Sequence, residues 1–192
     1  MQRFLIIAAG LTAATVLAAS QVQASTWVLD YTATNGATPS EADLTLDVSD
    51  VRNTNNGSNS GFDVLGISGQ VDGDSITGLI ANPGLPNAST SADGWFIYDN
   101  VFYAGQSPVL SNPGLLFTGA SGAEYNLFSD NATTYELYQA RAGVGFTENS
   151  VGTLAAVAVP EPASWMLMIV GFGGVGAVLR RRRHAQLSPI TA

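Results

Sequence analysis

The sequence has 192 residues, no cysteine, a single histidine at position 184 and a net charge of −8. Without cysteine, disulfides, thiol catalysis and zinc–thiolate sites are excluded. With its only histidine near the C-terminus, residues 25–159 cannot hold a Ser-His-Asp triad or a histidine metal site. Those residues carry ten aspartates and four glutamates against Arg52 and Arg141, a net charge of −12. Such a surface repels nucleic acid, which we do not expect as a partner.

The N-terminus has the pattern of a secretory signal peptide. Arg3 supplies a short basic start, residues 4–19 are apolar and uncharged, and small residues end at Ala24. We predict a signal helix over residues 1–24, with cleavage between Ala24 and Ser25. The secretory translocon and signal peptidase are the partners that this pattern implies.

Residues 25–159 alternate between apolar and polar positions in short runs separated by turns, which predicts strands. Asp72-Gly73 predicts a tight turn, and Asp99-Asn100 lies between two apolar runs at hairpin spacing. The expected strands are 27–31, 44–48, 62–68, 75–81, 95–98, 101–103, 115–117, 125–129, 134–141, 144–147 and 151–159. No run is long enough for a helix of three turns, so we predict one all-β domain, an antiparallel β-sandwich of which a jelly roll is one form.

Aromatic residues lie mostly inside these runs, which favours a role in the core. The expected core aromatics are Trp95, Phe96, Phe102, Phe117 and Phe128. The alternative is a carbohydrate platform, which needs exposed rings on one sheet face or loop. The plausible suppliers of such rings are Trp95, Tyr98, Tyr103 and Tyr138.

Acidic side chains suggest two further kinds of site. Asp72 and Asp74 flank one tight turn, and carboxylate oxygens suit Ca²⁺. A second acidic group, formed by Asp43, Asp47 and Asp50, precedes an asparagine-rich loop. We therefore keep calcium binding as a hypothesis; no other cofactor is indicated.

A glycoside hydrolase can be built from two carboxylates alone. Its candidate members are Glu124, Glu136 or Glu148, paired with an aspartate. Because most of these acids fall at turns or on outward strand positions, solvation is the simpler explanation, and we expect no catalysis.

The C-terminal region combines a short motif, an apolar stretch and a basic cluster. Pro160-Glu161-Pro162 is followed by Trp165 and by an uncharged run to residue 179. Fifteen helical residues extend roughly 22 Å, less than a hydrocarbon core of about 30 Å, so we predict a short transmembrane helix. The cations that follow should hold residues 184–192 in the cytoplasm; they are Arg180, Arg181, Arg182 and Arg183.

This tail resembles the PEP-CTERM sorting signal of Gram-negative bacteria, in the variant with tryptophan after the Pro-Glu-Pro element. The resemblance covers residues 160–183 and departs from the family at Met166, where alanine is usual. The matching residues are Pro160, Glu161, Pro162, Trp165, Gly171, Phe172, Gly173 and the four arginines. The resemblance implies recognition and cutting near the Pro-Glu-Pro element by an exosortase-like membrane transpeptidase, and a link to exopolysaccharide and biofilm.

Together these patterns predict a signal peptide (1–24), an exported acidic domain (25–159), a sorting signal (160–183) and a cytoplasmic tail (184–192). We expect a non-enzymatic envelope or matrix protein, anchored transiently in the inner membrane, then processed and associated with exopolysaccharide. The alternatives are a secreted carboxylate-based glycan hydrolase and a calcium-binding adhesive module.

Overall fold

The computed structural model describes residues 25–52, 61–84, 87–160, 166, 168–173 and 180. Strands dominate this part of the chain, and all their pairings are antiparallel. The strands are β1 (Ser25–Ala33), β2 (Glu41–Arg52), β3 (Phe62–Val71), β4 (Asp74–Leu79), β5 (Ser89–Thr90), β6 (Ile97–Tyr98), β7 (Val101–Phe102), β8 (Leu115–Gly119), β9 (Ala123–Ser129), β10 (Tyr135–Arg141) and β11 (Gly145–Val159).

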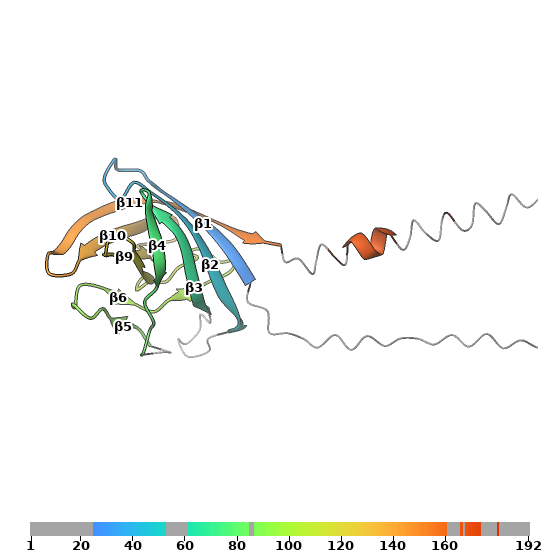
Figure 1. Cartoon of the computed structure of the whole chain (residues 1–192), viewed down its shortest axis with the longest axis horizontal. Helices are drawn as coiled ribbons and strands as arrows, with labels where there is room; N and C mark the ends of the chain where they lie inside the picture. Colours follow the sequence, from blue (N-terminus) through green and yellow to red (C-terminus); the bar gives the residue numbers. More distant parts are fainter. Residues whose placement is uncertain are drawn as a thin grey trace, which may run out of the picture.

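Eight strands form one closed, barrel-like sheet (Figure 1). Their order is β2-β1-β11-β10-β9-β8-β4-β3, and β3 pairs back onto β2. The all-β, antiparallel prediction is confirmed, but the two packed sheets expected of a sandwich are replaced by this single sheet. The difference arises because β2 pairs along both of its edges, which leaves no free edge there.

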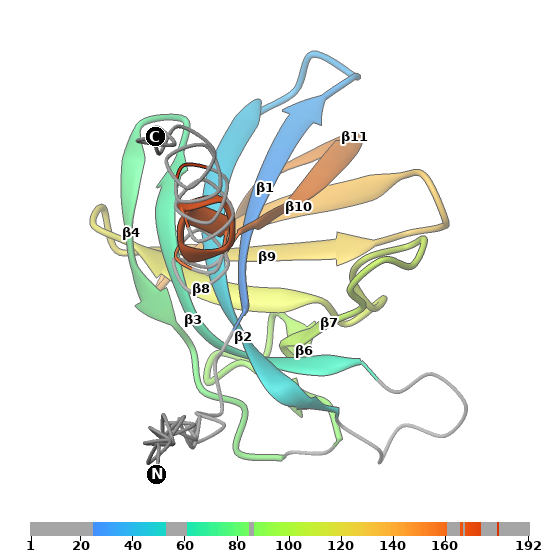
Figure 2. The ribbon, with the colours of Figure 1, turned by 90° about the vertical axis from the view of Figure 1, so that its right-hand side faces the viewer.

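Local irregularities help the sheet to curve. The register shifts between Asp47 and Val48 on β2, between Ile76 and Gly78 on β4, and in β10 where it meets β11. Such bulges bend a strand and increase its twist. The closed sheet is seen with its strands fanned around the axis in Figure 2.

The inward-facing side chains form the main core. Alternate residues of β1 and β2 are buried, among them Leu29, Tyr31, Leu44 and Leu46, and they pack with residues of β8–β10. The hydroxyl of Tyr31 shares a hydrogen bond of 2.8 Å with Ser150, which satisfies the polar group inside the core. The period-2 pattern in the sequence therefore identified the buried face correctly.

The hairpin expected around Asp99-Asn100 is wrong. β6 pairs with β5 and β7 pairs with β3, so the two runs diverge. The backbone N–H groups of Asp99 and Asn100 both donate to the carbonyl of Gly114. These two residues therefore join the chain to β8 and do not form a two-residue hairpin turn.

The two chain ends of the closed sheet lie side by side. Thr26 on β1 is the register partner of Val159 on β11, one residue before Pro160 (Figure 1). The predicted signal-peptide cut after Ala24 and the Pro-Glu-Pro element therefore flank one pair of strand ends. Ala24, and with it the predicted signal helix, lies outside the described residues.

Part of the expected C-terminal helix is described. Met166 and residues 168–173 are helical and Arg180 is too, with exposed apolar side chains such as Phe172. In the part of the chain that is described, no helix has the length and apolar character needed to cross a membrane. The remaining positions of the predicted span lie outside that part.

Candidate functional site

A second, smaller core lies on the outer face of the closed sheet. Phe96 and Tyr98 pack there against Leu116 on β8 and Ala140 on β10. We call residues 88–98, which contain β5 and β6, the flap. Because β8 and β9 are covered on both faces, their residues are mostly buried, whereas β10 alternates between buried and half-buried positions.

Asn100, two residues after the flap, forms side-chain hydrogen bonds that hold the end of the flap against the sheet. Its side-chain amide donates to the carbonyl of Ile80 at 2.8 Å, and its side-chain oxygen accepts from the N–H of Leu116 at 3.0 Å. The side chain thus bridges the two backbones where β4 has ended and β8 begins. Asn100 is 3% exposed, so both bonds are shielded from water and their loss would be costly.

The neighbouring residue, Asp99, forms a second set of hydrogen bonds at the same place. Its Oδ1 accepts from the hydroxyl of Ser111 at 2.6 Å and from the N–H of Val101 at 3.1 Å. Burial raises the pKa of Asp99 although these hydrogen bonds act in the opposite direction. The side-chain amide of Asn82 also donates to the backbone carbonyl of Asp99. A buried polar network therefore sets the position of the flap.

A pocket of about 270 Å³ lies where the flap meets the sheet. The flap contributes one wall, the loop before β8 a second, and β9 with β10 the floor. The lining residues are Trp95, Phe96, Ile97, Asn112, Pro113, Asn126, Phe128 and Tyr138. Tyr138 is the one ionisable group among them.

Aromatic rings dominate this pocket, which we call the aromatic pocket. Phe128 and Tyr138 meet edge to face with ring centroids 5.1 Å apart, and Tyr138 meets Phe146 in the same way at 5.1 Å. Such contacts fix ring orientation and stabilise each pair by about 0.5–1.5 kcal/mol beyond burial. Trp95 as a residue is 55% exposed, so part of this large apolar side chain is accessible to a ligand.

Gly145 allows Trp95 to lie close to the start of β11. A Cβ atom at this position would come within 2.7 Å of the indole ring. The glycine also has φ of +89°, a conformation that side chains disfavour. The Trp95 ring therefore spans from the flap to the turn between β10 and β11.

The polar groups of the pocket are held in place by backbone contacts. The amide of Asn126 donates to the carbonyls of Pro113 and Leu115, each at 3.0 Å, and that of Asn112 donates to Ser129. Hydrogen bonding to Glu136, burial and nearby acidic charge raise the pKa of Tyr138 to about 12. The phenol therefore keeps its proton at neutral pH.

The structure brings together only two of the four rings proposed for a carbohydrate platform. Trp95 and Tyr138 line the aromatic pocket, whereas Tyr98 is 3% exposed and donates its hydroxyl to the carbonyl of Ala81. Tyr103 lies instead beside a different pocket, at residues 103–112 and 129.

Phe96, Phe102 and Phe117 are buried as expected, but the core assignment is wrong for Trp95 and incomplete for Phe128, which lines the pocket floor. Sequence reasoning missed Phe146. The sequence did carry a signal for this residue: Phe128, Tyr138 and Phe146 are aromatic side chains at outward positions of three successive strands.

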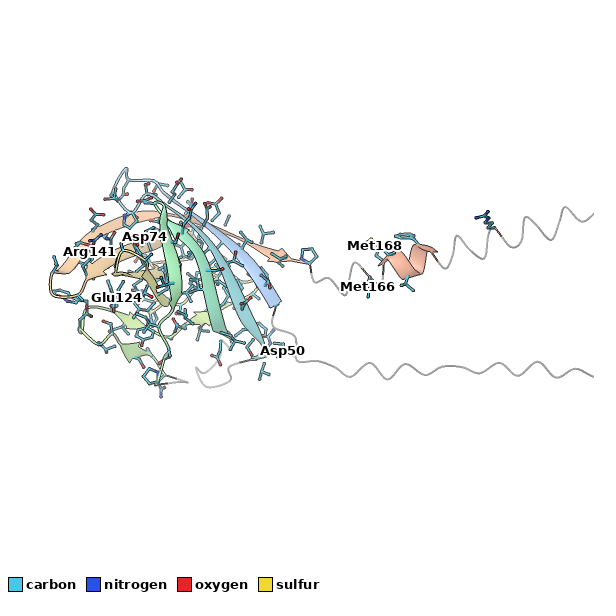
Figure 3. All side chains as sticks on the ribbon, in the orientation of Figure 1. Asp50, Asp74, Glu124, Arg141, Met166 and Met168 are labelled. Atoms are coloured by element: carbon cyan, nitrogen blue, oxygen red, sulfur yellow. The ribbon has the colours of Figure 1, made fainter. Side chains whose placement is uncertain are left out.

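Glu124 is a half-buried residue of β9 that does not line the pocket. Its Oε2 has no hydrogen-bond partner in the described structure. Burial, followed by the charge of Asp93, raises the pKa of Glu124. Figure 3 shows Glu124 at the end of the sheet that also carries Asp74 and Arg141. The other hydrolase candidates, Glu136 and Glu148, lie on β10 and β11.

Asp72 and Asp74, the two residues predicted to bind calcium, form hydrogen bonds with two different loops. Asp72 accepts from the N–H and hydroxyl of Ser40 and from the N–H of Glu41 at 2.8–3.1 Å. Asp74 accepts from the N–H and hydroxyl of Ser121 and from the hydroxyl of Tyr125 at 2.6–2.9 Å. Burial alone would raise the pKa of Asp74, but these bonds and the charge of Arg141 leave it lowered.

Asp43, Asp47 and Asp50 lie exposed along β2, with Asp43 accepting from the amide of Gln70. Among the described residues, no three or more acidic or histidine side chains are arranged to hold an ion. Calcium binding stays a prediction.

The tail is the second candidate site. Pro160 directly follows β11, Gly171, Phe172 and Gly173 are helical, and Arg180 is exposed. The other predicted sorting residues lie outside the described part; they are Glu161, Pro162, Trp165, Arg181, Arg182 and Arg183. Residues 158–183 match the family model of the PEP-CTERM protein-sorting motif.

This segment is a PEP-CTERM sorting motif. It marks an exported protein with a C-terminal membrane-anchoring sorting signal, and its general processing partner is an exosortase-type enzyme. Comparisons with curated proteins and with solved structures gave no match. The PEP-CTERM motif therefore identifies how the chain is sorted, while the role of residues 25–159 must be argued from their own geometry.

The buried carboxyl group of Glu124 should make stability depend on pH. Because the folded state raises its pKa, stability from this group is present below the unfolded value of about 4.3 and is lost as pH rises through the folded value. The variant Glu124→Gln cannot ionise. We expect its unfolding free energy, relative to the natural protein, to increase between about pH 3 and pH 7, as measured by denaturant titration.

Glu148→Gln is the matched control, because Glu148 is an exposed residue of β11. Its difference from the natural protein should stay nearly constant between the two pH values. If the difference in unfolding free energy for Glu124→Gln is equally constant, ionisation of Glu124 does not destabilise the folded state.

Proposed function

We propose that the closed-sheet domain binds extracellular polysaccharide through the aromatic pocket, and that the PEP-CTERM tail delivers it to the cell envelope or matrix. One observation carries this proposal. The exposed side chain of Trp95 lies in the same pocket as Phe128 and Tyr138, which meet edge to face, and Phe146 packs against Tyr138 from outside the pocket lining. Flat aromatic faces beside fixed polar groups suit a ligand that presents both C–H faces and hydroxyl groups, which is the chemistry of a sugar ring.

The composition of the pocket favours binding over catalysis. Its described lining contains aromatic, aliphatic and amide side chains, with no carboxylate. Glycoside hydrolysis needs two carboxylates at the scissile bond. The pKa of Glu124 is raised, as a catalytic acid requires, but its Oε2 is shielded from solvent and Glu124 does not line the pocket. No comparable observation supports the hydrolase or the calcium-dependent adhesive module.

The sorting part of the proposal rests on the PEP-CTERM motif and on the signal-peptide pattern. The chain would pass through the translocon, lose residues 1–24 to signal peptidase, and be held in the inner membrane with residues 184–192 in the cytoplasm. An exosortase-like enzyme would then cut near Pro160-Glu161-Pro162. The freed domain would become part of the cell surface or extracellular matrix.

Removing the exposed ring should weaken polysaccharide binding. We expect Trp95→Ala and, separately, Tyr138→Ala to lower the affinity of the full chain, purified in mild detergent, at least about tenfold, as is typical of a central aromatic contact. The measurement is isothermal titration with polysaccharide isolated from the source organism's matrix. Melting curves of both variants would verify that the fold is retained.

The control for that experiment is Leu65→Ala, which removes another exposed apolar side chain, 63% accessible on β3. Its affinity should equal that of the natural protein. Equal affinity for all three variants, with folds intact, would rule out the aromatic pocket as the binding site.

Processing should leave the closed sheet whole. Because Val159 pairs with Thr26, a cut before residue 159 would remove part of the β1–β11 ladder. We expect mass spectrometry of the mature protein to find Ser25 at the N-terminus and a C-terminus between residues 159 and 165. Replacing Pro160, Glu161 and Pro162 by alanine should cause accumulation of chains that retain the tail, and mature natural protein ending at Ala192 would refute processing.

A further inference from the structure

Acidic side chains surround the aromatic pocket. The Asp93 carboxylate accepts from the backbone N–H of Trp95 at 3.1 Å and from the hydroxyl of Ser91 at 2.6 Å, which fixes a negative charge against the backbone of Trp95. On the floor of the pocket, Glu136 lies two residues before Tyr138 on β10 and therefore on the same face of that strand, and the charges of Glu136 and Asp130 both act on Tyr138. We call Asp93, Asp130 and Glu136 the acidic rim.

The described part of residues 25–160 offers no compensating cation at this place. It contains no lysine and two arginines, and neither arginine lines the pocket. The guanidinium of Arg52 lies 4.9 Å from the ring centre of Phe62 on β3. Arg141 acts on Asp74 and Tyr125. An anionic ligand would therefore meet like charge without a nearby ion-pair partner.

We propose that the ligand of the aromatic pocket is an uncharged polysaccharide, and that the acidic rim excludes glycans that carry carboxylate groups. This inference rests on the proposed function and specifies its ligand class. A carboxylate brought within a Debye length of the rim, about 8 Å at physiological ionic strength, experiences repulsion from several charges at once. In the apolar pocket it would also lose hydration, which aromatic rings and amides replace poorly. A neutral sugar chain incurs neither cost.

The rim thus works by rejecting competitors, whereas the rings supply attraction. Specificity is a difference between two affinities, and unfavourable contacts with the wrong ligand contribute to it as much as favourable ones with the right ligand. An acidic polysaccharide could still bind if a divalent cation bridged it to the rim. The test therefore includes EDTA throughout.

Three matched polysaccharide pairs isolate charge from backbone type: dextran and carboxymethyl dextran, hydroxyethyl cellulose and carboxymethyl cellulose, and fully methyl-esterified polygalacturonate and its free acid. The full chain in mild detergent is titrated with each by calorimetry at low salt and pH 7. We expect the neutral member of every pair that binds to bind at least tenfold more tightly than the acidic member. About 1 M NaCl, where the Debye length is about 3 Å, should narrow the difference.

Substitutions test whether the acidic rim causes the discrimination between neutral and acidic polysaccharides. Asp93→Asn, Asp130→Asn and Glu136→Gln combined should raise the affinity for the acidic member of each pair severalfold relative to its neutral partner. The matched control, Asp43→Asn, Asp47→Asn and Asp50→Asn combined, removes three exposed charges from β2 and should leave the discrimination unchanged.

The outcomes separate the two proposals. Acidic members that bind as tightly as neutral ones, with this binding lost in Trp95→Ala, would overturn the inference and keep the pocket as a glycan site. Equal discrimination in the rim variant and the natural protein would also overturn it. If no member of any pair binds, or if binding survives in Trp95→Ala, the proposed function itself fails.

Discussion

The pairing of β2 with β3 is the constraint on which the other features depend. It closes the sheet, so the chain between β4 and β8 has two places to lie: it pairs with the start of β3, as β7 does, or it packs on the outer face. The flap takes the outer face, fastened by Asp99 and Asn100. Gly69 allows the closure, because a Cβ there would collide with the carbonyl of Asp43 across the β2–β3 ladder.

The aromatic pocket follows from this arrangement. The flap covers the apolar outer face of β8–β10 incompletely, and the uncovered remainder is the floor that contains Phe128 and Tyr138. Acidic charge lies close to this site, because Asp93 accepts from the backbone of Trp95 and the charges of Glu136 and Asp130 act on Tyr138. Under the proposed function, one set of charges would serve both the solubility of the domain and the selection of its ligand.

Sequence reasoning predicted what depends on local pattern. Alternation in residues 27–31 and 44–48 identified strands and their buried faces, and the Pro-Glu-Pro element with its basic stop identified the sorting motif. The sequence could not predict that the sheet closes on itself. A strand in a sandwich and a strand in a closed sheet have the same period-2 pattern, and only the pairing between distant strands distinguishes the two folds. The turn at Asp99-Asn100 was misread because buried side-chain bonds, which carry no local signature, determine its path. Trp95 was assigned to the core because hydrophobic character alone does not reveal exposure.

A crystal structure of the protein with a neutral oligosaccharide tests the central claim most directly. The account predicts sugar rings lying against the indole of Trp95 and beside Tyr138, with the flap in place over the outer face of the sheet. Sugar bound at another surface, such as the pocket beside Tyr103, with the Trp95 face left open to solvent, would contradict it.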